Sequence, residues 1–270
     1  MKIKNIMKNS SLSEEQKNYL KNYYREYYLI TFGRIFLFIL LLSLWQISSS
    51  LRWIDSFFFS SPLKIISLFV EMTKNFVIWK HIGVTLLETI VSFLGVTILS
   101  LLTAIGLYLS PKVAKILEPS FVVLNSLPKS ALAPLIIVWL GTGVKTIIIA
   151  GISVAVFGSI ISLYTGFLQI DPEKIKLITT LGGGKKDLLF KLILPSCTSL
   201  IISNMKVNIG LSLVGVIIGE FLAAKQGLGY LIIYGSQIFQ LDLLIMSIVI
   251  LCIIASVLYK IILYFEKRYC

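Results

Sequence analysis

Long apolar runs alternate with short charged segments along most of this chain, and no other feature restricts its fold as strongly. The runs lie at about 31–50, 82–109, 118–140, 146–164, 196–222 and 241–263. Each approaches or exceeds the ~20 residues that an α-helix needs to cross a bilayer. Hydrophobic residues make up 57% of the sequence, which is above the usual content of a soluble domain. We therefore predict an all-α polytopic membrane protein with about six transmembrane helices.

The basic residues fall mainly on one side of these runs. Of the 25 Lys and Arg residues, 17 lie in 1–34, in 112–115, in 171–195 or after 259. Loops rich in Lys and Arg stay in the cytoplasm, so we expect both termini and 171–195 to lie there. Because this topology accounts for the net charge of +12, we expect the basic residues to contact membrane lipid, and we expect no binding to nucleic acid.

The residue types that catalysis and metal binding require are scarce. His81 is the single histidine, and Cys197, Cys252 and Cys270 are an odd number that forms no disulfide framework. Lys186 follows Gly184 and Lys185 at the position where a phosphate-binding loop requires Ser or Thr. We therefore predict no catalytic residue, no metal site and no cofactor bound by this chain. If transport is driven by ATP, another chain must hydrolyse it.

The charged segment 171–195, DPEKIKLITTLGGGKKDLLFKLILP, is broken by glycines and predicts two short helices with a hinge. Asp171 can cap a helix over 172–181, and the three glycines from Gly182 end it because they allow positive φ. Asp187 could cap a second helix over 187–194, and Pro195 would open the next membrane run. Two interpretations remain: a hairpin in the lipid headgroup layer, or a knob that fits a groove on a soluble partner.

Several polar side chains lie inside the apolar runs, where they are costly unless they face protein or water. Glu88 lies on one helical stripe with Thr85, Thr89 and Ser92. Lys129 lies in a run that Pro128 and Pro134 should interrupt, so we expect this run beside a cavity. Lys129 could instead snorkel to the interface or pair with Glu88.

The run over 196–222 contains amides and small residues at helical spacings. Asn204 and Asn208 share a face and could hydrogen-bond to a neighbouring helix. Gly215 and Gly219, which are also four residues apart, would allow close helix packing.

The segment 171–195 resembles the coupling loop of permease subunits of binding-protein-dependent bacterial ABC importers. Their pattern is E-A-A, three residues, G, nine residues, I, any residue, L-P; Gly182, Leu192, Leu194 and Pro195 fit its second half, with Leu192 in place of Ile. Its first half differs, because Lys176 begins the triplet that stands where E-A-A is expected. Glu173 lies about one turn earlier.

Three other segments resemble the nitrate, sulfonate and taurine type of these permeases. They are SLPKSALAPLIIVWLGTG at 126–143, GVIIGEFLAAKQGLGYLI at 215–232 and FFFSSPLKIISLF at 57–69. The domains expected on this basis are a cytoplasmic N-terminal lead over 1–30, a first transmembrane helix and outer loop over 31–56, and a permease domain over 57–266 with its coupling loop at 165–195.

The resemblance implies a function and partners. Two permease copies, in a homodimer, would enclose a pathway for a small anionic or polar organic solute in the bacterial cell membrane. A solute-binding protein outside would deliver the solute, and an ATPase subunit would hold the ATP and Mg. The implied coupling residues are Glu173, Lys176, Gly182, Gly183, Asp187, Leu192, Leu194 and Pro195. The expected pathway residues are Glu88, Asn125, Lys129, Ser130, Asn204 and Asn208.

An ion-coupled secondary transporter is the alternative function. It would use Glu88, Lys129 and Glu220 as a charge relay at broken helices. Transport that continues without ATP but stops when the proton gradient collapses would favour this alternative. A membrane enzyme fits less well, because paired catalytic groups are lacking.

Overall fold

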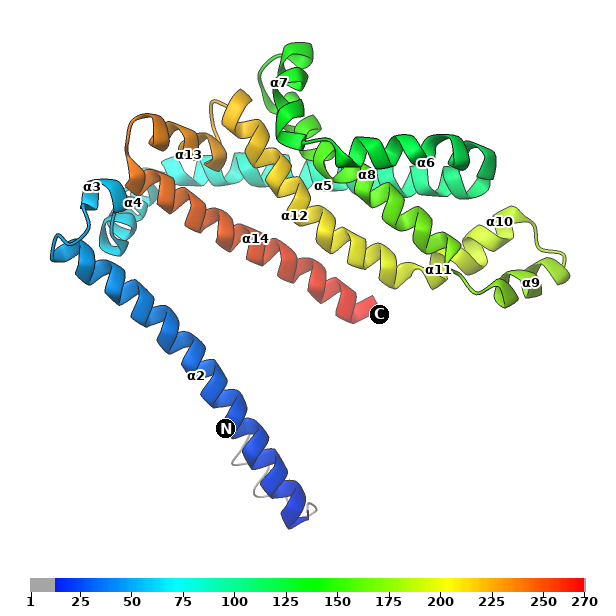
Figure 1. Cartoon of the computed structure of the whole chain (residues 1–270), viewed down its shortest axis with the longest axis horizontal. Helices are drawn as coiled ribbons and strands as arrows, with labels where there is room; N and C mark the ends of the chain where they lie inside the picture. Colours follow the sequence, from blue (N-terminus) through cyan, green and yellow to red (C-terminus); the bar gives the residue numbers. More distant parts are fainter. Residues whose placement is uncertain (1–12, 270) are drawn as a thin grey trace. The chain divides into compact units, whose positions relative to one another are not determined.

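The computed structural model describes residues 13–269, and every regular element in this part of the chain is a helix (Figure 1). It contains two compact units, one ending at Lys64 and the other beginning at Ile65. Residues 1–12, which belong to the predicted N-terminal lead, and residue 270 lie outside the described residues. The predicted domain boundary at residue 57 stays a prediction.

The first unit consists mainly of one long helix, α2 (Glu14–Ser50). Ser13 caps it: the N–H of Gln16 donates to Ser13 Oγ, and the Gln16 side chain accepts from the N–H of Ser13. Residues 18–50 are long and apolar enough to cross a membrane. The predicted first span, 31–50, is therefore the second half of a helix that also includes most of the described part of the predicted lead.

Two hydrogen bonds attach the short segment after α2 to its end. Trp45 Nε1 donates to the carbonyl of Phe59 in α3 (Ser56–Phe59), at 3.2 Å. The N–H of Leu63 donates to Gln46 Oε1 at 3.1 Å. Helix α4 (Pro62–Lys74) starts here.

Four long helices form the body of the second unit: α5 (Val77–Leu109), α8 (Val144–Leu168), α12 (Thr198–Ala223) and α14 (Leu241–Tyr269). With α2, they make five candidate spans among the described residues, or six when the bent pair α6 and α7 counts as one. The predicted fold of about six transmembrane helices is confirmed at this level.

Glycines bring α8 and α12 together, as the sequence predicts. A Cβ on Gly215 would lie 2.8 Å from the Cα of Gly151, and one on Gly219 would lie 3.1 Å from the Cα of Ile147. Neither position has room for a side chain, because the facing atoms belong to backbone. The two helices therefore pack backbone to backbone, as small residues permit in membrane proteins.

The predicted third span is two helices that meet at 99°: α6 (Pro111–Ser126) and α7 (Lys129–Leu140). The break falls at Leu127, which is extended because a residue before proline disfavours the α conformation. One detail of the prediction is wrong, because Pro134 lies within α7 without ending it. The residues that precede the predicted third span are also helical, from Pro111 onward.

Two further features define the ends of the second unit (Figure 1). Helices α9 (Pro172–Thr180), α10 (Lys185–Asp187) and α11 (Leu194–Ser196), between α8 and α12, form one end, which we call the hairpin end. At the other end lie the turn 141–143, the turn 224–227 and α13 (Leu228–Gln237), which we call the turn end.

Candidate functional site

The first helix of the hairpin, α9 (Pro172–Thr180), has the ends that the sequence predicts. The N–H of Glu173 donates to Asp171 Oδ1 at 2.9 Å, so Asp171 is the cap. At the other end, the N–H of Gly182 donates to the carbonyl of Thr179 and the N–H of Gly183 to that of Ile178. This pair of bonds is a Schellman motif, which needs the positive φ of +83° at Gly182.

The second helix starts two residues earlier than predicted, with α10 (Lys185–Asp187). Asp187 is not the capping residue. It lies in the first turn, where its Oδ2 accepts from the N–H of Gly184 at 3.1 Å and its Oδ1 pairs with Lys191 Nζ at 2.7 Å. The hydrogen bond from Lys191 and that from Gly184 hold the pKa of the Asp187 carboxyl below its usual value.

A wide turn interrupts this second helix. Residues 188–193 form a π-helix, η1 (Leu188–Ile193), and the N–H of Leu194 donates to the carbonyl of Leu189, five residues back. The next residue, Pro195, has no N–H and clashes with the carbonyl four residues before it in a regular helix. The wide turn before it removes the need for that N–H. Pro195 itself lies inside α11 (Leu194–Ser196), so the prediction that it opens the following helix is wrong; that helix starts at Thr198.

One face of the hairpin packs against the ends of α5 and α8. Leu188, Leu189 and Ile193 are buried in one cluster with Leu163 and Phe167 of α8. Leu192 and Leu194, two of the implied coupling residues, are half-buried against the same cluster. These contacts fix the hairpin on the ends of the long helices.

The opposite face exposes large apolar side chains. Leu177 is 61%, Leu181 78% and Phe190 65% exposed. Among the implied coupling residues, Glu173 and Lys176 are exposed on α9. A buried face that anchors the hairpin and an exposed apolar face with charges beside it suit a docking surface for another protein. Leu181 and Phe190 were not predicted as site residues, although they are apolar residues within a charged segment.

Lys129 lies at the sharp bend between α6 and α7. Its Nζ donates to the carbonyls of Leu124 at 2.7 Å and Asn125 at 3.0 Å, which are among the last carbonyls of α6. It also lies 5.7 Å from the ring centroid of Phe157. Lysine thus satisfies carbonyls that the bend leaves without helical partners. The suggested pairing of Lys129 with Glu88 is absent from the described part of the chain.

The other predicted pathway residues occupy two different environments. Asn125 and Ser130 are exposed beside the bend. Asn204 and Asn208 are buried, and both donate to Ser159 of α8, to its carbonyl at 3.2 Å and to its Oγ at 3.0 Å. The predicted hydrogen bonds to a neighbouring helix therefore exist. A pathway role for these asparagines stays a prediction.

A buried carboxyl organises the turn end. Glu220 is 1% exposed; its Oε1 accepts from Thr85 Oγ1 at 2.6 Å and its Oε2 from the N–H of Gly229 at 2.5 Å. Thr85 Oγ1 also accepts from the N–H of Leu228, and the N–H of Gly227 donates to His81 Nδ1. Sequence reasoning placed Glu220 only in the alternative relay. Glu220 is followed seven and nine residues later by Gly227 and Gly229, whose N–H groups lie open to an acceptor, and this spacing is the signal that could have identified Glu220 as the acceptor for the turn.

Glu88 lies next to Glu220 but is held differently. It is also 1% exposed, and apart from a hydrogen bond that a protonated carboxyl would form with Glu220, neither of its carboxyl oxygens has a partner among the described residues. It lines a cavity of about 320 Å³ at the turn end together with Thr142 and Lys225. The polar stripe of α5 thus faces protein, as predicted, and only part of it is satisfied by hydrogen bonds.

Comparison with known proteins gives a consistent result. The family model described as "Binding-protein-dependent transport system inner membrane component" matches residues 96–269. A probable ABC transporter permease protein of Haemophilus influenzae is 28% identical over 219 residues, which cover 81% of this chain and 89% of the relative. The taurine transport system permease protein TauC of Escherichia coli is 25% identical over 224 residues, 81% of each chain.

A solved structure supports the fold. A chain of the MetNI methionine ABC transporter, in an inward-facing conformation, matches with a TM-score of 0.63 at 16% identity. The match covers 72% of this chain and 97% of the other. At this identity the likeness concerns the fold alone.

Proposed function

This chain belongs to the family of binding-protein-dependent transport system inner membrane components, and we propose how it works in such a transporter. It is a multi-pass permease subunit in the inner membrane and is not itself catalytic. Its family implies an ATPase subunit and a binding protein as partners. We infer that its hairpin end transmits ATP hydrolysis to the helices and that α6 and α7 border the solute pathway.

The two faces of the hairpin carry the coupling proposal. The buried face, with Leu189 and Ile193, ties the hairpin to α5 and α8, so a force on the hairpin reaches the long helices. The exposed face presents Leu181 and Phe190, which would be costly to leave in water and which a groove on the ATPase would cover. Helix-in-groove docking is a common way for a short amphipathic helix to bind.

Charge supports the cytoplasmic placement of this end. Lys174, Lys176, Lys185, Lys186 and Lys191 all belong to the hairpin. Short loops rich in lysine remain in the cytoplasm. An ATPase there could therefore reach the hairpin, and the binding protein would meet the turn end.

The test replaces exposed apolar residues of the hairpin. Leu181→Ser and Phe190→Ser should leave the thermal stability of the permease unchanged, since neither side chain is buried. Each should weaken binding of the ATPase subunit about tenfold or more, as for a truncated interface anchor. Phe239→Ser is the matched control, because Phe239 is 63% exposed but lies outside the hairpin. Normal ATPase binding by both hairpin variants would contradict the coupling role.

The pathway proposal rests on the bend between α6 and α7. A bend of 99° leaves backbone groups without helical partners, and membrane proteins place such groups next to protein or water. Asn125 and Ser130 are exposed there, and Lys129 adds a positive charge. These groups suit a small polar or anionic organic solute. Relatives named for taurine and for formylaminopyrimidine transport are consistent with this class.

We also propose that the pathway forms between two copies of this chain. In one protomer, Asn125 and Ser130 at the bend are exposed, so the described part of a single chain does not cover them. A second copy related by a two-fold axis would place two such bends opposite each other, as is usual in symmetric oligomers.

A further inference from the structure

The cavity beside Glu88, which we call the turn-end cavity, has the composition of a ligand pocket. Its apolar walls include Val84 of α5, Ile147 of α8 and Ala223 of α12. Glu88 is buried among them, whereas Lys225 in the same lining is exposed. The cavity therefore opens to solvent near Lys225 and has a carboxyl group on its inner side. Its volume of about 320 Å³ is at the lower end of the range for ligand pockets, which are mostly apolar with a few polar groups.

Glu88 is the unsatisfied member of the carboxyl pair at this end. Glu220 accepts hydrogen bonds from Thr85 and Gly229, so donors within the chain already stabilise its charge. For Glu88, a proton shared with Glu220 is the one hydrogen bond available among the described residues. A buried carboxyl group is costly unless it is hydrogen-bonded or paired with a cation. The turn-end cavity leaves room for such a partner directly beside Glu88.

Lys225 does not supply the missing positive charge. It lines the same cavity, but no ion pair is found for it among residues 13–269. Because Lys225 is exposed, water and salt screen its charge, whereas the buried Glu88 lies in a medium of lower dielectric constant. For a cation inside the cavity, attraction by an ionised Glu88 therefore outweighs repulsion by Lys225.

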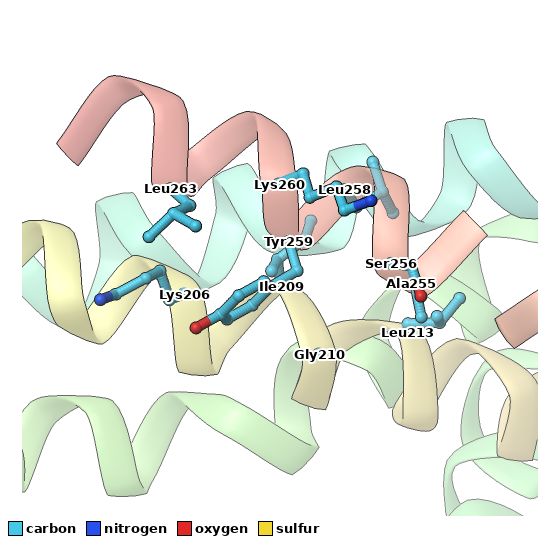
Figure 2. A pocket seen from close by; sticks show the side chains of 10 residues that line it. All are labelled: Lys206, Ile209, Gly210, Leu213, Ala255, Ser256, Leu258, Tyr259, Lys260 and Leu263. Carbon is cyan, nitrogen blue, oxygen red and sulfur yellow. The ribbon is translucent and has the colours of Figure 1, made fainter. Parts of the chain in front are cut away.

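The larger groove between α12 and α14 provides a contrast (Figure 2). Its volume is about 550 Å³, and its charged or hydroxyl-bearing lining residues are all at least partly exposed: Lys206, Ser256, Tyr259 and Lys260. Lys206 is also paired with Glu266 at 2.7 Å. No polar residue that lines this groove is both buried and unsatisfied. The turn-end cavity differs because its inner polar group, Glu88, lacks a partner that would compensate its charge.

We propose that the turn-end cavity binds a protonated nitrogen of the transported solute. The ammonium group donates hydrogen bonds to the Glu88 carboxylate, and the apolar walls contact the carbon atoms beside the nitrogen. The proton shared with Glu220 leaves to water as the ammonium arrives, because two adjacent carboxylates need one positive charge between them. Thr142 in the cavity lining follows α7, which borders the proposed pathway. The inference rests on the outward orientation of the turn end in the proposed function, and it adds a substrate class: small amines, zwitterions included.

The experiment measures the charge preference of a cysteine placed in the cavity. Thr142→Cys is made in the full transporter in nanodiscs. Mass spectrometry follows its reaction with cationic 2-aminoethyl and anionic 2-sulfonatoethyl methanethiosulfonate, each relative to its rate with a free thiol. We expect the cationic reagent to react about tenfold faster, because a cleft with one sign of charge concentrates the opposite charge. Adding Glu88→Gln should remove most of this preference. The ratio of the two rates cancels any effect of neighbouring charges on the thiol itself.

A second measurement uses methylammonium as the probe. Methylammonium chloride should slow the reaction of Thr142→Cys with the cationic reagent more than sodium chloride does at the same ionic strength. Asp242→Asn is the matched control: it removes a carboxylate at the start of α14, outside the cavity lining, and should keep the original preference. In right-side-out vesicles, the impermeant anionic reagent labels Thr142→Cys only if the turn end is outside. A wrong orientation would therefore be detected separately from a cavity without cation preference.

Three outcomes would overturn the inference. The first is an equal relative rate for the two reagents, which would mean that the cavity does not attract cations. The second is an unchanged preference after Glu88→Gln, which would mean that Glu88 keeps its proton. The third is no slowing by methylammonium beyond that by sodium chloride. If the solute-free binding protein slows the reaction instead, a side chain of that protein and not the solute occupies the cavity.

Discussion

The two ends of the second unit are built in opposite ways. At the turn end, polar groups are buried: Glu220 joins α5, α12 and the start of α13 through hydrogen bonds with Thr85 and Gly229. At the hairpin end, apolar groups are exposed, with Leu181 and Phe190 on the surface. Buried hydrogen bonds hold the parts of one chain together, whereas exposed apolar side chains are stabilised when another chain covers them and removes them from water. The turn end is therefore held together by buried hydrogen bonds within one chain, and the exposed apolar groups of the hairpin end suit the partner that we propose.

The largest expected effect tests the closed end. Glu220→Ala leaves the Thr85 hydroxyl and the Gly229 N–H without their acceptor in a buried site. We expect a loss of about 2–4 kcal/mol in the free energy of unfolding, since each such donor costs about 1–3 kcal/mol. Thermal unfolding in detergent measures it. Glu88→Gln is the comparison: the equally buried Glu88 side chain accepts no hydrogen bond from Thr85 or Gly229, so this variant should lower stability less than Glu220→Ala.

The second prediction compares a glycine at each end. Gly227 has φ +119° and Gly182 has φ +83°, so alanine strains the backbone at both. At Gly227 the new Cβ would also contact the Glu220 carboxyl, whereas at Gly182 it would meet nothing within 4 Å. Gly182→Ala should cost about 1–2 kcal/mol, the penalty of a left-handed residue. Gly227→Ala should cost more, and equal melting temperatures for the two variants would contradict this comparison.

A smaller effect is expected in the middle, where Ser159 accepts from Asn204 and Asn208 and donates to Ser100 Oγ at 2.8 Å. Ser159→Ala removes the hydroxyl and two of these bonds. Hydrogen bonds between membrane helices contribute about 0.6 kcal/mol on average, so stability should fall by about 1 kcal/mol. If these groups only join helices, the transport rate of the folded variant should be normal. A selective loss of transport would support the predicted pathway role of the asparagines.

The smallest effect concerns Asp187 and pH. Its pKa is lowered in the folded hairpin by the hydrogen bond from Lys191 and that from Gly184. A lowered carboxyl pKa contributes stability above the ordinary value, and that contribution is lost as the pH falls through the lowered value. The protection factors for amide hydrogen exchange at Gly184 and Leu188, which exclude the intrinsic pH dependence of exchange, should therefore fall as the pH drops below the ordinary Asp pKa of about 3.9. Asp187→Asn should exchange faster at neutral pH and show little of this dependence.

The sequence predicts most of the architecture, because hydropathy and glycine placement act locally. The spans, the cap at Asp171 and the positive φ at Gly182 follow from residues close in sequence. The close approach of α8 and α12 also follows from Gly215 and Gly219, since only small residues allow it. Each of these features depends on chemistry that a short segment already contains.

The contacts between distant segments could not be predicted. Thr85 and Glu220 are 135 residues apart, and their hydrogen bond depends on how α5 and α12 pack. Lys129 was mispredicted for a different, local reason: charge alone suggested a partner such as Glu88, but the bend supplied carbonyls only four and five residues away. Asp187 was expected to cap the N–H groups that follow it, but from the first turn it accepts from the N–H of Gly184, which lies three residues before it.

The wide turn η1 has a geometrical consequence for the joint between the hairpin and α12. A turn closed by i to i−5 bonds holds one residue more than an α-helical turn. Residues after it are therefore out of phase with those before it by one residue, which corresponds to about 100° of rotation and about 1.5 Å of rise in an α-helix. The faces of the helix before the turn and of α12 are thus offset by a fixed angle, and deleting one residue from 188–193 would bring the two into a single helical phase.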